Sequence, residues 1–159
     1  MANSQFEAGF TLVEIMITIA IIATLAALTL VNLGKPQVTA SQNSTVDTLV
    51  ADLKSQQLLA IAGDSGGSPS QQPQGVYIQA GQYTLFAGPN FDSQDANNFS
   101  ITASQDTTFS TTFPGSKVVF TTGNGEVQNF SGTTNAITVH HSGDTKTITI
   151  NRLGAVTVN

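Results

Sequence analysis

The feature that most constrains this chain is an uncharged run of twenty residues, Ile15 to Gly34, which directly follows the carboxylate of Glu14. A helix of this length, at about 1.5 Å per residue, extends about 30 Å, the hydrocarbon thickness of a bilayer. The run lacks the polar stripe of a core helix in a soluble protein. We therefore expect a hydrophobic transmembrane or assembly helix over residues 10–34.

Glu14 is the carboxylate at the head of this apolar helix. Placing an ionised group in lipid costs about 2.5–3.5 kcal/mol or more, so an acid in this position is a functional candidate by default. A plain membrane anchor explains the apolar run but gives Glu14 no role. A cleavable secretory signal, cut near Ala27, needs a basic start and a shorter run, and this chain has neither.

The residues around Glu14 have a further pattern. Gly9-Phe10-Thr-Leu-Val-Glu14 followed by an apolar helix resembles the processing site of type IV pilins and pseudopilins. The resemblance implies that a membrane-embedded prepilin peptidase cuts between Gly9 and Phe10, removes residues 1–9 as a leader and methylates the amine of Phe10. It also implies that Glu14 is an assembly residue, which pairs with the Phe10 amine of a neighbouring subunit.

Two departures from that family pattern are visible. The leader contains no Lys or Arg, so the positive-inside signal is weak. The first proline is Pro36, which follows Gly34, so a break in the helix is expected at Gly34–Pro36.

Composition limits the remaining classes of function. The chain has 159 residues, 9% of them charged, no cysteine and a formal net charge of -5, which suits one secreted or surface β-rich domain with an appended helix. Its five basic residues are scattered, so direct nucleic-acid binding is disfavoured. They are Lys35, Lys54, Lys117, Lys146 and Arg152.

An amphipathic helical pattern resumes after Ser41 and extends to Ala62, so residues 35–62 are expected to continue the helix. Ser44 is a candidate N-cap, and Gly63 is a candidate C-terminal stop. The expected apolar stripe consists of Val46, Leu49, Val50, Leu53, Leu58 and Ile61.

Residues 63–159 read as a β-rich body, because the apolar period changes to two after a loop rich in Gly, Ser, Pro and Gln. Strands are expected at 76–80, 83–86, 99–103, 107–113, 117–122, 126–130, 136–141, 145–150 and 155–158. Turn signals predict hairpins at 81–82, 123–125 and 142–144. The predicted class is α+β, with a long N-terminal helix packed on an antiparallel sheet body, as in pilins.

The C-terminal half also resembles a narrower group, the GspH/FimT-type minor pilins and pseudopilins. The matching stretches are Val118-Val-Phe120, Gly125-Glu-Val127 and the tail from Thr147 to Val156. Some FimT-type proteins bind DNA through basic residues near the C-terminus. Here the tail offers Arg152 with Lys146 nearby, too little positive charge for that role.

No pattern indicates catalysis, a cofactor or a metal, and we expect no enzyme. His140 and His141 are adjacent in a predicted strand, so they point to opposite faces and cannot chelate one ion together. Asp92, Asp95 and Asp106 are interpreted as solvated loop acids, because they lack the dense spacing of a calcium loop.

The sequence therefore predicts a structural minor subunit, at or near the tip of a type II secretion pseudopilus or type IV pilus. Its implied partners are other pilins, the prepilin peptidase and an inner-membrane assembly platform. The implied location is a single pass of the inner membrane with the body outside the cytoplasm. The alternatives are a major type IV pilus subunit, a membrane-anchored extracellular binding module that forms no filament, and a secreted binding protein.

Overall fold

The structure is a computed structural model that describes residues 10–30 and 34–159 of the chain, and side chains from residue 43 onward in the second range. The chain divides into two compact units, residues 1–39 and residues 40–159. The described part of the first unit contains helix α1 (Leu12–Leu30) and the start of helix α2 (Gly34–Ala62). The second unit contains the rest of α2 and all eight strands.

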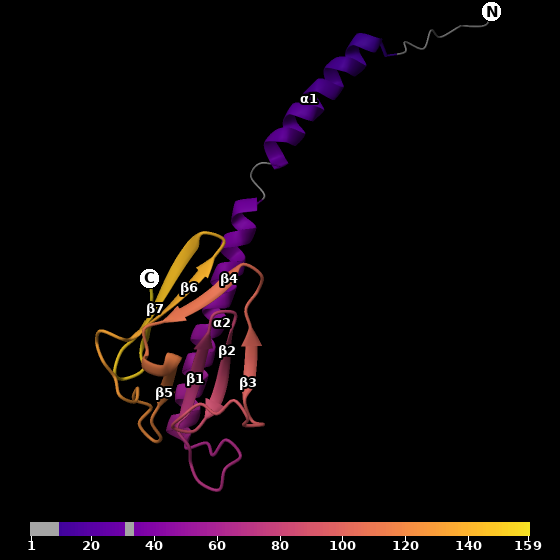
Figure 1. Cartoon of the computed structure of the whole chain (residues 1–159). Coiled ribbons are helices and arrows are strands. Elements are labelled where there is room, and N and C mark those ends of the chain that lie inside the picture. The colour runs from indigo at the N-terminus through magenta and orange to yellow at the C-terminus, as the bar shows by residue number, and fades with distance from the viewer. Residues whose placement is uncertain (1–9, 31–33) are drawn as a thin grey trace, which may run out of the picture. The chain divides into compact units, whose positions relative to one another are not determined.

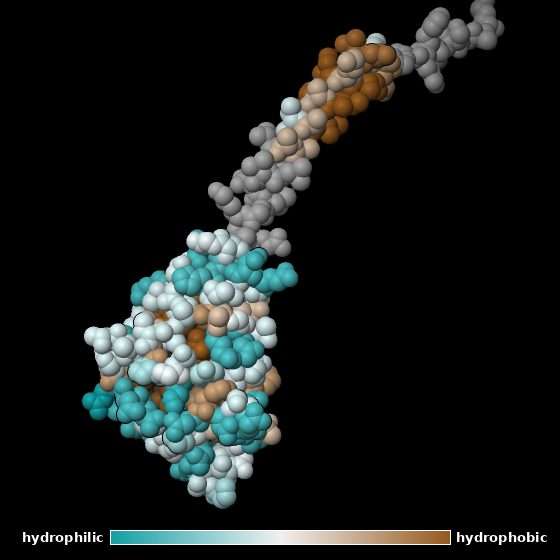
Figure 2. All heavy atoms as spheres, viewed as in Figure 1, coloured by the Kyte–Doolittle hydropathy of each residue, from teal (hydrophilic) through white to brown (hydrophobic). Residues whose placement is uncertain are grey.

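Helix α1 is a solvent-exposed apolar helix. Its described side chains are exposed, and Figure 2 shows them as a mainly hydrophobic surface. Within the described ranges, neither helix combines the length and the apolar character that a bilayer crossing requires. The expected apolar run to Gly34 includes residues 31–33, which lie outside the described residues.

Helix α2 begins ten residues earlier than the candidate cap at Ser44, so that prediction was wrong. Ser44 lies inside the helix, where its carbonyl accepts a hydrogen bond from Thr48 Oγ1 at 2.8 Å. Gly34–Pro36, where a break was expected, form the first turn of α2, a position at which proline is tolerated.

The C-terminal end of α2 agrees with the prediction for Gly63. Gly63 has φ +75°, and its N–H donates to Ala60 O at 3.2 Å. Asp64 N donates to Leu59 O at 2.9 Å, which completes a Schellman motif. Only a residue without a Cβ adopts this backbone at low cost, so glycine ends the helix here.

Two four-stranded antiparallel sheets pack against α2 (Figure 1). The first sheet has the order β3-β2-β1-β5 and the second β4-β6-β7-β8. The strands of the first sheet are β1 (Gln74–Gln79), β2 (Gln82–Ala87), β3 (Phe99–Thr102) and β5 (Lys117–Phe120). Those of the second are β4 (Thr107–Thr111), β6 (Ala136–His141), β7 (Asp144–Ile150) and β8 (Val156–Val158).

The β1–β2 and β6–β7 hairpins confirm the turn signals at 81–82 and 142–144. The turn predicted around residues 123–125 is present, since Gly125 N donates to Thr121 O at 2.9 Å, but the strand predicted after it is not. Residues 126–130 form no strand, and only a single bridge joins Val127 to Phe120. Thr121 N and Gln128 N donate across the bridge to Glu126 O and Val119 O, at 2.8 Å each, while Val127 N donates to Arg152 O in the tail at 2.9 Å.

One core is shared by α2 and the inner faces of both sheets. The helix contributes Val46, Leu49, Leu53 and Ala60. Tyr83 of β2 meets Phe109 of β4 edge to face, with ring centroids 5.6 Å apart, so the two sheets are in contact through aromatic side chains. The sequence prediction of two buried residues was wrong, since Leu58 and Ile61 are exposed. Gln56 and Ala60 take their places on the buried stripe.

Leu53 is fully buried in the core and Leu58 is exposed, so the two residues of α2 provide a matched test of the core. Leu53→Ala is expected to lower the free energy of unfolding by about 2–5 kcal/mol, because it leaves a cavity in the shared core. Leu58→Ala, with a side chain that is 65% exposed, is expected to change it by less than about 0.5 kcal/mol. Urea unfolding of the full chain followed by circular dichroism measures both. Equal losses would contradict the observed orientation of α2.

Candidate functional site

The N-terminal end of α1 contains the residues that the sequence singled out. Gly9 lies outside the described residues, and Phe10 is 82% exposed. Glu14 is exposed and occupies the first turn of α1. The structure therefore places Phe10 and Glu14 at the same helix end, four residues apart in the chain.

Thr11 and Glu14 form a capping box at this end. Glu14 N donates to Thr11 Oγ1 at 3.3 Å, and Thr11 N donates in return to Glu14 Oε2 at 3.4 Å. These reciprocal bonds satisfy two N–H groups that a helix leaves without partners at its N-terminus. The motif Thr-x-x-Glu is a recognised signature of a helix start, so the sequence contained this signal, although the sequence prediction did not use it.

The capping box leaves part of the Glu14 carboxylate unused. Thr11 N and Thr11 Oγ1 both donate to Oε2, at 3.4 Å each, while Oε1 accepts no hydrogen bond from the described residues. A carboxylate has about four acceptor positions, so Glu14 can hold its own helix end and still accept a charged donor. The positive end of the helix dipole favours a negative charge at this position.

The histidines lie on opposite faces of β6, as expected. His140 is exposed, and its Nδ1 lies 3.0 Å from Thr145 Oγ1. His141 is buried, and its Nδ1 lies 2.6 Å from Thr107 Oγ1. Across the described ranges, no group of three or more His, Cys, Asp or Glu residues is placed to hold a metal ion.

The loop acids have local structural roles. Asp92 Oδ1 accepts a bond from Gln94 N at 2.9 Å, and Asp95 Oδ1 accepts one from Asn97 N at 2.9 Å. Such bonds to the backbone two residues onward stabilise turns. In the tail, Arg152 pairs with Glu126 at 3.4 Å, which leaves less of its positive charge for a phosphate.

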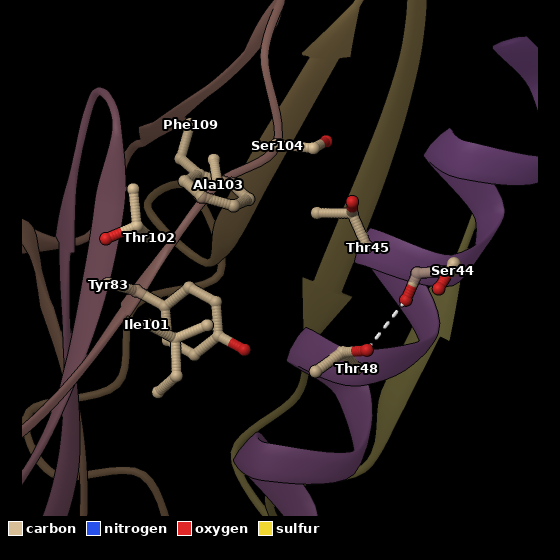
Figure 3. A pocket seen from close by; sticks show the side chains of 9 residues that line it. All are labelled: Ser44, Thr45, Thr48, Tyr83, Ile101, Thr102, Ala103, Ser104 and Phe109. Atoms are coloured by element: carbon tan, nitrogen blue, oxygen red, sulfur yellow. Dashed lines mark hydrogen bonds between the residues drawn. The ribbon is translucent and has the colours of Figure 1, made fainter.

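A hollow of about 140 Å³ lies between α2 and the β2–β3 pair (Figure 3). Ser44, Thr45 and Thr48 line it from the helix, where the Thr48 hydroxyl turns toward the Ser44 carbonyl, and Tyr83 lies on the opposite side. The Tyr83 hydroxyl donates to Asp52 Oδ2 at 2.6 Å. Burial, followed by this bond, raises the pKa of Tyr83 far above its usual value, so its hydroxyl stays protonated and is unsuited to act as a base.

The raised pKa of Tyr83 has a consequence for stability. The folded state holds this proton more tightly than the unfolded state, so the stabilisation is complete below about pH 10 and is lost as the pH rises above it. We expect the urea midpoint to fall above about pH 10 in the native chain. Tyr83→Phe is expected to lose about 1–2 kcal/mol near neutral pH and to show a weaker alkaline decline. Tyr77→Phe is the control, and an identical alkaline decline in both variants would contradict the assignment.

Comparison with known proteins adds one finding at this site. A family model described as the prokaryotic N-terminal methylation motif matches residues 5–30, a range that contains Gly9, Phe10 and Glu14. No curated protein matches the chain, and no solved structure matches it. The motif supports a type IV pilin-like protein, a class that is processed by a prepilin peptidase and assembles with other pilins.

Proposed function

We propose that this type IV pilin-like chain is a structural minor subunit, at or near the tip of a type II secretion pseudopilus or type IV pilus. The observation that carries the proposal is the methylation-motif match at residues 5–30, together with the carboxylate at the head of α1. The GspH/FimT-type group remains the narrower proposal, supported by the sequence resemblance of the C-terminal half. The proposed function requires no catalytic activity of this chain.

Processing would create the charge that Glu14 needs as a partner. A cut between Gly9 and Phe10 releases a positive amine directly before Thr11, and its methylation keeps that charge. In an apolar helix bundle each ion alone is costly, whereas a paired amine and carboxylate are tolerated. Because Glu14 Oε1 accepts no bond from the described residues, the Phe10 amine of a neighbouring subunit has an acceptor available.

The exposed surface of α1 supports a membrane-anchored subunit. Its outward side chains include Leu12, Ile15, Ile19, Ile22 and Leu25, an apolar surface that water solvates poorly. We propose that lipid covers this surface before assembly and that neighbouring helices cover it in the filament. The β-rich body then remains outside the cytoplasm.

The processing step is tested first, on protein isolated from its own cell membranes. Intact mass and N-terminal peptide mapping are expected to find a chain that starts at N-methylated Phe10. Gly9→Val places a branched side chain at the proposed cut site, so this variant is expected to retain Met1. A native chain that retains Met1, or one that starts near Leu28, would overturn the proposal.

The role of Glu14 is tested with two substitutions that separate its charge from its capping. Glu14→Gln keeps a capping-box acceptor but removes the charge, and Glu14→Ala removes both. If the ion pair is required, both variants are expected to fall at least tenfold in sheared filaments, measured by immunoblot against the membrane fraction.

Thr11→Ser, which keeps the capping hydroxyl, is the matched control and is expected to assemble normally. Normal incorporation of Glu14→Gln would show that Glu14 acts only as a helix cap. A native chain absent from filaments would favour the anchored binding module, and an abundant one would favour a major subunit.

A further inference from the structure

A second cavity, of about 240 Å³, lies in the β-rich body. Its lining comes from the C-terminal half of α2, from β1 and β2, and from the segment that leads into β3. Figure 1 shows these strands beside the helix. The lining residues that bear on its chemistry are Gln56, Gln74, Leu85, Asn97 and Phe99.

Gln56 is the unusual member of this lining. It occupies the buried stripe of α2, is 6% exposed, and its Oε1 has no hydrogen-bond partner among the described residues. Buried amides in native proteins are nearly always hydrogen-bonded, so an unpaired amide beside a cavity indicates that a partner enters from the cavity.

Two further amides line the same space and are only partly used. Gln74 Nε2 donates to Asp64 O at 3.2 Å and to Gln72 O at 3.5 Å, and Asn97 Nδ2 donates to Asp95 Oδ1 at 3.2 Å. Within the described structure the side-chain carbonyl oxygens of both residues accept no hydrogen bond. The cavity thus combines donors and acceptors, and none of the described residues that line it is ionisable.

An aromatic ring lies at the same cavity. Phe99 of β3 is 66% exposed and pairs in register with Leu85 of β2, so an apolar surface adjoins the three amides. A sugar ring has complementary chemistry. Its C–H face packs on an aromatic face, and each hydroxyl both donates and accepts hydrogen bonds.

We propose that this cavity binds a neutral sugar residue, with the ring on Phe99 and hydroxyls on the amides of Gln56, Gln74 and Asn97. The cavity is smaller than pockets for drug-sized ligands, which favours a single ring. No described lining residue supplies a positive charge, and the carboxylates of Asp64 and Asp95 bond the lining residues Gly66 and Asn97, so an acidic sugar is disfavoured. This binding goes beyond the filament role and does not depend on α1.

The test uses the full chain in a detergent without a sugar headgroup, such as an amine oxide. Saturation-transfer difference NMR is run with the methyl glycosides of glucose, galactose, mannose, N-acetylglucosamine and N-acetylgalactosamine. At least one is expected to bind, with a dissociation constant on the order of 1 mM for a ligand of this size. Methyl glucuronide is expected to bind at least tenfold more weakly.

Two variants locate the binding. Phe99→Ala and Gln56→Leu are each expected to raise the dissociation constant at least tenfold. Gln105→Leu, in an exposed loop outside the cavity lining, is the matched control and is expected to leave it unchanged. Circular dichroism checks that each variant is folded, and Gln56→Leu is expected to be at least as stable as the native chain, since it removes an unpaired buried amide.

Three results would overturn the proposal. The first is that no neutral glycoside of the panel binds the native chain. The second is that binding persists unchanged in both cavity variants. The third is that methyl glucuronide binds as tightly as the neutral glycosides, which would indicate contact with another surface.

Discussion

The contact between one stripe of α2 and the inner faces of two small sheets is the interaction on which the body depends. Each sheet has four strands, too little to bury its apolar face alone, and two packed layers are the minimum for a core. Leu49 and Leu53 are fully buried where the layers meet. The helix therefore covers both sheets at once, and its residues line both the hollow at Tyr83 and the cavity at Gln56.

The polar contacts between α2 and the rest of the body are hydrogen bonds and include no ion pair among the described residues. Asp52 bonds Tyr83 on one side of α2, and Gln57 Nε2 donates to Gly125 O at 3.0 Å and Leu153 O at 2.7 Å on another. Glu126 with Arg152 is the ion pair found among the described residues. Because most of these contacts are hydrogen bonds with little or no ionic character, the packing of the body should depend only weakly on salt.

Local patterns predicted the parts of the fold that local chemistry decides. Gly63 ends α2 because a positive φ favours glycine, and the turns at 81–82 and 142–144 join the strands that they were expected to join. The helix stripe was only half predicted. By hydrophobicity alone, Leu58 is expected to be buried rather than Gln56. The position of the two sheets decides which side of α2 is buried, and that side contains Gln56.

Long-range contacts account for the rest. Val127 N donates to Arg152 O in the tail, and Gln57 Nε2 donates to Leu153 O across 96 residues of sequence. No local pattern contains such pairings. At the N-terminal end of α1 the sequence alone identified Phe10 and Glu14 as candidate residues. It also contained the capping motif of Thr11 and Glu14. The unpaired side-chain oxygen of Gln56 could not be predicted from the sequence, because it depends on how the surrounding residues pack.

The hydrogen bonds made by Gln57 and Asp52 have a mechanical consequence. They run from the side of α2 to the turn at Gly125, to the tail at Leu153 and to the ring of Tyr83, and thus lie across the helix axis. A pull along α2 would therefore load these hydrogen bonds in shear, together with the packed core. Such an arrangement suits a body that is held in place by one helix while its surroundings move.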